Sequence, residues 1–345
     1  MEKALTYQQV YLLPNKGIVK SRADANISVE FLGFKLRAPW MPANMSTVIN
    51  PDIAYWLSLR SYPYIMHRFG DTFEFVKRAN QQEWNLVSIS VGVKQEDIKL
   101  IEKIISNNFR VNWITIDIAH GHHVLVEEMI KTIKNLYKNS QLTCPSIIAG
   151  NVATPYAVKD LKKWGADAVK VGIAGGAACS TKNQTGFHMP MFTCVNHCYE
   201  FGGSASEGTG KITDIPIIAD GGIRDNGDIA KAIVAGATLV MAGSMFAACT
   251  DAPGENIYAK QRVDYINKSF KQENGPITHK RYYGSASEHQ KGSKKHVEGF
   301  QVDLACNGLT YIEKYQELKE CLQSSVSYAG GDSLDSLRKV NWINV

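Results

Sequence analysis

The sequence predicts an α/β fold, a (β/α)8 barrel. Eight short apolar runs rich in Val and Ile recur along the chain, and amphipathic segments with charged residues lie between several of them. Near-continuous apolar runs are typical of strands buried on both faces of a parallel sheet. Strand–helix units in alternation, eight in number, are typical of this barrel. The length of 345 residues would also suit two domains, but one decorated barrel fits equally well, and we expect a single domain over 1–345.

The expected strands are, in order, 36–45, 62–67, 86–91, 111–119, 145–150, 167–173, 215–220 and 237–243. Apolar residues at a spacing of three to four predict helices between them, over 96–107, 123–139, 155–165 and 226–236. Gly165 and Gly236 close two of these helices, since glycine is a common helix stop. Asp225 and Asn226 are expected to cap the last of the four.

Two regions break this alternation. Residues 202–211 are rich in Gly and Ser and predict a surface insertion. Residues 251–310 are long, polar and poorly periodic, and such a segment after the last barrel strand is unusual unless it is functional. We therefore expect a mobile flap over the barrel mouth at about 270–310. A disordered tail is the alternative, but residues 311–331 return to an amphipathic pattern, which predicts a C-terminal helical segment at about 311–345.

Composition and charge limit the function classes. Lys and Arg number 38 against 33 Asp and Glu, and they form no long run. This balance suits an anionic small substrate better than nucleic acid. No apolar stretch approaches the ~20 residues of a membrane span, and the first residues lack the pattern of a secretory signal. Seven cysteines without a framework spacing indicate free thiols in a reducing cytoplasm. We expect a cytoplasmic protein with neither nucleic-acid nor membrane partners.

The segment 170–186, KVGIAGGAACSTKNQTG, follows the sixth expected strand and carries the strongest chemical signal. Its glycines permit a tight loop whose backbone groups bind an anion or a cation. Cys179 lies in this loop beside Ser180 and Thr181, and a cysteine on a strand-end loop is accessible as a nucleophile. The alternative is a small packed hydrophobe, which is the commoner role of a lone cysteine.

Residues 217–247 predict a phosphate site. Loops after the seventh and eighth strands of such barrels often bind phosphate, and Gly221–Gly222 and Gly243–Ser244 fall there. The alternative for these glycines is simple turn geometry. Asp220 would repel a phosphate and is better placed to accept hydrogen bonds from sugar hydroxyls.

Weaker candidates remain for metal or phosphate binding. One histidine cluster follows the fourth expected strand, but it has no evident third ligand set, so a metal there is not expected. Zinc at Cys194, His197 and Cys198 lacks a second pair of ligands. The basic run 291–296 either binds phosphate or is a solvated loop.

Several motifs together resemble the IMP dehydrogenase/GMP reductase family. They are GIAGGAACSTK, IIADGGIRDNGDIAKAIVAGA, AGSM, YQQVYLLP, PANM and AGNV, and the resemblance runs from about residue 7 to the end. The paired regulatory (CBS) insert usual in IMP dehydrogenases has no room here, because the connections between the first strands are short. The flap sequence after Tyr282 also lacks their Arg-Tyr pair, since the dipeptide Arg281–Tyr282 lies before that stretch. The chain is most similar to the shorter, bacterial-type GMP reductase branch of the family.

The resemblance implies an activity. It is the NADPH-dependent reductive deamination of GMP to IMP and ammonia, through a covalent thioimidate on Cys179, in purine nucleotide salvage. Thr181 and Glu298 resemble the pair that protonates the departing ammonia. A homotetramer is implied, with GMP and IMP as its small-molecule partners.

The resemblance also implies binding roles. Asp220 resembles the ribose ligand. The remaining substrate contacts would be Gly222, Gly243, Ser244 and Tyr282 at the phosphate and the backbone of Ser285 and Ala286 at the base. Arg68, Asp117 and Ala119 would meet the nicotinamide cofactor. Backbone carbonyls would hold a monovalent cation, with K+ as the candidate; they belong to Ala174, Gly176 and Cys179.

The sequence departs from the family pattern in three places, and alternatives stay open. Ala174–Gly175–Gly176 replaces the usual Gly-Pro-Gly, which changes the stiffness of the loop. Ala177 replaces a hydroxyl residue, and Gln8–Gln9 replaces an Asp pair. One alternative is an IMP dehydrogenase that makes XMP from IMP with NAD. Another is a non-catalytic purine-nucleotide-binding barrel, and a third is a flavin-dependent oxidoreductase.

Overall fold

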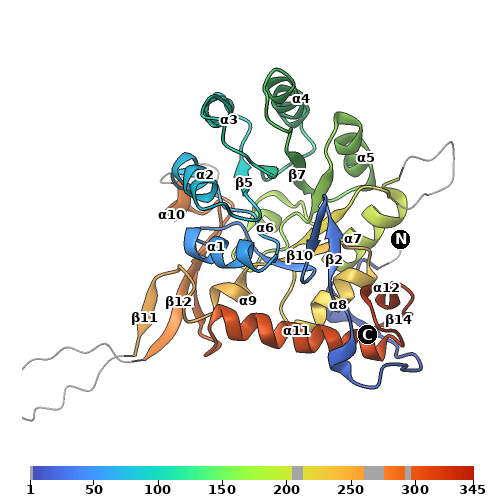
Figure 1. The fold of residues 1–345 in the computed structure, drawn as a ribbon. Coiled ribbons are helices and arrows are strands. Elements are labelled where there is room, and N and C mark those ends of the chain that lie inside the picture. Colours follow the sequence, from blue (N-terminus) through green and yellow to red (C-terminus); the bar gives the residue numbers. More distant parts are fainter. Residues whose placement is uncertain (1–2, 204–212, 260–275, 292–296) are drawn as a thin grey trace, which may run out of the picture.

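Seven parallel strands form the central sheet, in the order β4-β10-β9-β8-β7-β6-β5. The first of them, β4, pairs with the last, β10, so the sheet curls round on itself as a barrel (Figure 1). The computed structural model describes residues 3–203, 213–259, 276–291 and 297–345. The strand bounds are β4 Trp40–Pro42, β5 Ser88–Val91, β6 Trp113–Asp117, β7 Ser146–Val152, β8 Ala168–Val171, β9 Ile217–Asp220 and β10 Leu239–Ala242. The predicted (β/α)8 barrel is confirmed.

The eighth expected strand, over 62–67, is reduced to a single bridge. Met66 pairs in parallel with Ile89 of β5, and no longer ladder forms in this part of the described chain. Pro63 has no N–H to donate, so it cannot contribute to a ladder at the start of the apolar run. The prediction of a full strand at 62–67 was therefore wrong, although the segment occupies the expected place beside β5.

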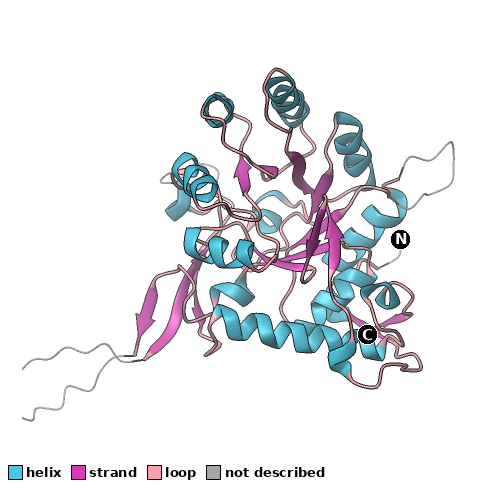
Figure 2. Cartoon of the chain, in the orientation of Figure 1, coloured by secondary structure: helices cyan, strands magenta, loops and turns pink. Residues whose placement is uncertain are grey.

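Helices cover the outside of the strands (Figure 2). They are α1 Pro51–Leu59, α2 Thr72–Gln81, α3 Gln95–Ser106, α4 Val124–Lys138, α5 Pro155–Trp164, α7 Met191–Phe201 and α8 Asn226–Val234. The four predicted helices are present as α3, α4, α5 and α8. Gly165 ends α5 with a positive φ of 106°, as expected of a helix stop. Asp225 caps α8, whereas Asn226 is its first residue rather than a cap.

The core lies between the strands and these helices. All residues of β5, β8 and β10 are buried, which fits a sheet covered on both faces. Residues 43–87 between β4 and β5 are all described, and they hold α1, α2 and connecting loops without an inserted domain. Among the described helices, none is both long and apolar enough to cross a membrane.

The segment after β10 leaves the barrel. A short helix, α9 Ser244–Ala247, leads to a three-stranded antiparallel sheet of β11 Asn256–Tyr258, β12 Ile277–Tyr283 and β13 Gln301–Ala305, which projects from one side (Figure 1). A further short helix, α10, spans Glu288–Lys291. Residues 270–275 and 292–296 of the expected flap lie outside the described residues, as does most of the 202–211 insertion. The basic run 291–296 lies there too, apart from the backbone of residue 291.

The chain ends against its own beginning. Two helices, α11 Tyr311–Tyr328 and α12 Leu334–Leu337, follow the flap. The segment 311–345 is not helical throughout, because it finishes in β14 Trp342–Asn344, which pairs with β1 Val10–Leu12. The other elements before β4 are η1 Tyr7–Gln9, η2 Arg22–Asp24, β2 Val29–Phe31 and β3 Phe34–Leu36.

Candidate active site at the carboxyl ends of the strands

A cavity of about 310 Å³ opens at the carboxyl ends of the barrel strands. Its volume is within the range of small-molecule sites, and this end of the barrel is where such folds bind their ligands. A larger hollow, about 560 Å³, lies at the amino end of β7 beside Cys144, away from this edge. The predicted site residues that line the first cavity are Arg68, Asp117, Ala119, Ala174, Gly176, Cys179, Thr181, Asp220, Tyr282, Ser285, Ala286 and Glu298.

Three of these residues form a continuous hydrogen-bonded chain. The Cys179 thiol donates to Thr181 Oγ1 at 3.1 Å, and the Thr181 hydroxyl donates to Glu298 Oε2 at 2.8 Å. Glu298 comes from the flap, 117 positions along the chain from Thr181. The arrangement gives the thiol a path along which its proton can reach a carboxylate.

Backbone pairing brings the flap to the loop 172–180 that follows β8 and carries Cys179, here called the cysteine loop. Cys179 forms an antiparallel bridge with Gly299, and the Ser180 N–H donates to the Glu298 carbonyl at 2.9 Å. The Phe300 N–H donates to the Ala178 carbonyl at 3.1 Å. Because these contacts engage Glu298 and the two residues after it, the position of its carboxylate depends on backbone contacts and not on its side chain alone.

The cysteine loop also packs against the loop after β9. The Gly222 N–H donates to the Gly175 carbonyl at 2.9 Å, and a Cβ on Gly221 would lie 2.9 Å from the carbonyl carbon of Gly175. Glycine is therefore required where the two backbones meet. Ala174 has a positive φ of 60°, which a residue with a side chain rarely adopts. The Gly176 carbonyl, one of the predicted cation ligands, accepts a hydrogen bond from the Cys179 N–H at 3.1 Å.

Sequence reasoning missed one residue of the site, Lys170. It lies on β8, is 1% exposed and lines the cavity. Its ammonium contacts Asp117 Oδ1 at 2.7 Å, Asn44 Oδ1 at 3.1 Å and Asp220 Oδ2 at 3.2 Å. A lysine inside the otherwise apolar run DAVKVGI was the available signal, since a fully buried lysine is rare unless it is paired.

The charges of this cluster shift one another's pKa values. Burial alone would lower the pKa of Lys170, but Asp117 and Asp220 outweigh it and raise that pKa above its usual range. Burial alone would likewise raise the pKa of Asp117, yet Lys170 outweighs it and holds that pKa low, with help from Arg68 and Asn44. Lys170 and Asp117 are thus both kept in their charged forms at neutral pH.

Two amides complete the cluster. Asn44 donates to Asp117 Oδ2 at 3.1 Å, and Asn151 donates to Asp220 Oδ2 at 2.8 Å. Asn151 also donates to the Gly172 carbonyl at 2.8 Å, which ties the carboxylate to the start of the cysteine loop. Asn44 follows β4 by two residues, and Asn151 is the last residue but one of β7, so both lie at the carboxyl ends of strands.

The predicted phosphate residues are less directly placed. Gly222, Gly243 and Ser244 do not line the cavity, although Tyr282 does. A Cβ on Gly243 would lie 2.6 Å from the Tyr282 hydroxyl oxygen, so the tyrosine packs directly on that glycine. Burial raises the pKa of Tyr282, with smaller contributions from Asp220 and Cys179, so the phenol keeps its proton.

The flap reaches across to the loop after β4. The Ser46 hydroxyl donates to Gln290 Oε1 at 2.6 Å, and the rings of Tyr283 and His289 lie 4.3 Å apart. On the same side, burial lowers the pKa of His67 to about 4. The flap therefore contacts the loop after β4 as well as the loop that carries Cys179.

The histidines and cysteines outside the cavity have structural contacts. His122 Nε2 lies 2.8 Å from Asp160 Oδ2, and His123 caps α4. Cys194 and Cys198 are buried on α7. Over the described ranges, no three His, Cys, Asp or Glu side chains gather as a metal site.

Comparison with known proteins agrees with this arrangement. The family model described as IMP dehydrogenase / GMP reductase domain matches residues 4–344. A protein of Mesoplasma florum named GMP reductase is 43% identical, with 99% of this chain and 97% of the relative covered. One of Helicobacter pylori with the same name is 44% identical, again with 99% and 97% covered. The chain belongs to the IMP dehydrogenase/GMP reductase family.

Proposed function

We propose that the protein is a GMP reductase, which converts GMP to IMP and ammonia with NADPH in purine nucleotide salvage. The observation that carries the proposal is the chain from Cys179 through Thr181 to Glu298 inside the cavity. The names of the relatives support it.

In the first half-reaction, Cys179 attacks C2 of the guanine. The thiol proton passes to Thr181 as the Thr181 proton passes to Glu298, so sulfur attacks as a thiolate. The C2–N bond then breaks, and Glu298 returns its proton through Thr181 to the leaving amino group, which departs as ammonia. A covalent thioimidate remains on Cys179, and the proton lost from the thiol is the one that ammonia carries away. Such general acid–base help is worth about 10²–10⁴ in rate.

The second half-reaction reduces C2. NADPH supplies a hydride when it is bound. As hydride reaches C2, the C2–S bond breaks, its electrons stay on Cys179, and IMP is free to leave. The sulfur then takes a proton through Thr181. Backbone contacts of the flap with the cysteine loop exclude water, which would otherwise hydrolyse the thioimidate to XMP.

The cavity fits both ligands by its chemistry. Asp220 offers a carboxylate to ribose hydroxyls, and Ser285 and Ala286 present backbone groups near Cys179. Tyr282 packs on Gly243, where Gly222, Gly243 and Ser244 would hold the phosphate. Arg68, Asp117 and Ala119 line the same cavity and would meet the cofactor. The carbonyls of Ala174, Gly176 and Cys179 would hold K+.

The proposal extends to the whole chain. We treat residues 1–345 as one domain, with the flap at 270–310 and the segment 311–345 as parts of it. The enzyme would act in the cytoplasm as a homotetramer. Sedimentation would show the tetramer, and an assay with K+ replaced by a larger organic cation would show whether turnover needs the metal.

A spectrophotometric assay with product analysis tests the proposal. With GMP and NADPH, we expect cofactor oxidation together with stoichiometric IMP and ammonia. If XMP instead forms from IMP and NAD, the protein is an IMP dehydrogenase. If GMP binds without any turnover, the protein is a non-catalytic nucleotide-binding barrel, and the proposal is wrong.

A further inference from the structure

We propose that Lys170 is a positioning residue that fixes the GMP-side carboxylate of Asp220 and the cofactor-side carboxylate of Asp117 on one ammonium. The proposal rests on the function proposed above, which assigns each carboxylate to a ligand. It adds that the two halves of the site share one cation, so that both ligands depend on a side chain that touches neither.

The geometry gives Lys170 no free donor. An ammonium has three N–H donors, and here three acceptors surround it: Asp117 at 2.7 Å, Asn44 at 3.1 Å and Asp220 at 3.2 Å. The side chain is 2% exposed. Lys170 therefore cannot bind a ligand without giving up a contact, which makes it a positioning residue.

The stem of the lysine is also held in place. A Cβ on Gly150 would lie 2.5 Å from Lys170 Cβ, so the neighbouring strand β7 packs its backbone directly on the side chain. The charged groups around the ammonium are Asp117 from β6 and Asp220 from β9, with Arg68 beyond Asp117. Asp220 lies on β9, next to β8, and Asp117 lies on β6, next to β7; both carboxylates contact the same nitrogen.

Loss of the ammonium would affect both carboxylates at once. Without the ammonium the two carboxylates repel each other, and Arg68 offsets that repulsion only on the side of Asp117. One of them takes a proton or turns away, and the ligand on that side loses its partner. A single substitution on β8 should thus weaken GMP and NADPH together, although Asp117 and Asp220 serve different ligands.

The test is a crossed rescue built on Lys170→Met, which keeps the unbranched stem of the side chain and removes the ammonium. We expect this variant to raise the KM for GMP and the KM for NADPH each about tenfold or more. Lys170→Met with Asp117→Asn removes the repulsion on Asp220 and should restore the KM for GMP but not that for NADPH. Lys170→Met with Asp220→Asn should restore only the KM for NADPH.

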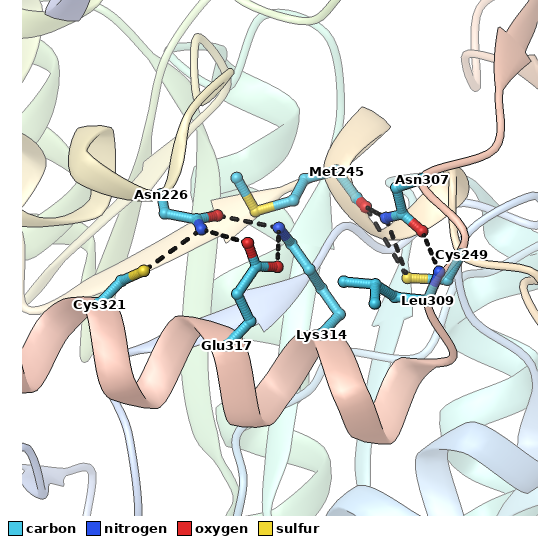
Figure 3. A network of polar contacts seen from close by, with 8 residues as sticks. All are labelled: Asn226, Met245, Cys249, Asn307, Leu309, Lys314, Glu317 and Cys321. Atoms are coloured by element: carbon cyan, nitrogen blue, oxygen red, sulfur yellow. Dashed lines mark hydrogen bonds and ion pairs between the residues drawn. The ribbon is translucent and has the colours of Figure 1, made fainter.

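The matched control is Lys314→Met. Lys314 is another buried lysine held by an acid and an asparagine (Figure 3), but it lies on α11 and does not line the cavity. A loss of stability alone would act on both lysines alike. We expect Lys314→Met to lower the melting temperature and to leave both KM values unchanged.

Two outcomes would overturn the proposal: Lys170→Met leaves one KM value unchanged, or neither double variant recovers its own ligand. If Lys170→Met does not fold, the double variants are compared with Asp117→Asn and Asp220→Asn instead. Lys170→Met with Asp117→Asn should then match Asp117→Asn in the KM for GMP. Lys170→Met with Asp220→Asn should match Asp220→Asn in the KM for NADPH. A mismatch in either pair overturns the proposal. If the wild type does not turn over GMP, the proposed function fails, and titration calorimetry with GMP and NADPH still tests Lys170.

Discussion

Two buried lysines show how similar chemistry serves different ends. Lys314 of α11 donates to Glu317 Oε2 at 2.8 Å and to Asn226 Oδ1 at 2.9 Å, and Asn226 donates back to Glu317 Oε1 at 2.8 Å (Figure 3). This closed ring joins α11 to the start of α8. Lys170 also contacts a carboxylate and an asparagine, with a second carboxylate in addition, but its partners line a cavity.

The difference lies in what the carboxylates face. In the ring, none of the three residues lines the cavity beside Cys179, so its hydrogen bonds act only between two helices. In the cluster, Asp117 and Asp220 keep part of their surface toward the cavity, with side chains 16% and 21% exposed. A buried network of charged residues indicates a functional site where its side chains line a cavity, and a structural role where they contact only one another.

Among substitutions in the cavity, removal of the nucleophile should lower kcat the most. We expect Cys179→Ala to lower kcat by more than about 10⁴-fold while GMP still binds, because sulfur supplies the covalent step and not the affinity. Initial rates and GMP titration measure the two effects. Retained turnover would show that the cavity works without the thiol.

The proton path should give the next largest effect. Thr181→Val and Glu298→Gln each remove one link of the path, and we expect kcat to fall about 10²–10⁴-fold. Ammonia release before hydride transfer should be impaired most, which rapid-quench analysis of the two half-reactions can show. Equal loss in both half-reactions would contradict the assigned role.

His67 tests a buried polar group next to the cavity. Burial lowers its folded pKa to about 4 from 6.5, so the unfolded chain takes up a proton first as the pH falls. The wild type should lose up to about 3 kcal/mol between pH 6.5 and pH 4, a loss that His67→Gln escapes. Denaturant unfolding across this range measures it, and parallel curves for both proteins would be inconsistent with a buried neutral histidine.

Substitutions in the ring between α11 and α8 should have the smallest effect on activity. Lys314→Met leaves Glu317 and Asn226 without their shared donor, and we expect about 1–3 kcal/mol of lost stability with kcat unchanged. Lys319→Met on the exposed face of α11 is the matched control. A fall in kcat for Lys314→Met would remove the distinction between the two lysines.

Sequence patterns predicted the frame of the molecule. Runs of Val and Ile marked the strands because both faces of this sheet are buried. Asp220 ends β9 as it ended the expected strand, whereas Asp117 ends β6 two residues before the expected boundary. The apolar run at 62–67 was wrongly predicted as a full strand, because apolar periodicity takes no account of a proline that lacks a backbone N–H. Helices α1 and α7 were not predicted, since their apolar residues leave no clear polar face. Helix α2 does show the pattern and could have been found.

The candidate site was harder to predict. Cys179 and Thr181 were visible within one loop, but Glu298 entered only through a family resemblance, because nothing local shows that a residue 117 positions away returns to Thr181. Lys170 was hidden in an apolar run, since only the three-dimensional structure brings β6, β8 and β9 to one ammonium. Local sequence patterns predict single helices and strands, whereas the contact of two carboxylates with the Lys170 ammonium depends on the order of the strands in the sheet.

Intact-mass analysis of the enzyme incubated with GMP, without NADPH, tests the central claim most directly. We predict a covalent nucleotide adduct on Cys179, one ammonia released for each adduct formed, and conversion of the adduct to IMP when NADPH is added. Cys179→Ala should form no adduct. Oxidation of NADPH and formation of IMP without any adduct, or with an adduct on another residue, would contradict the account.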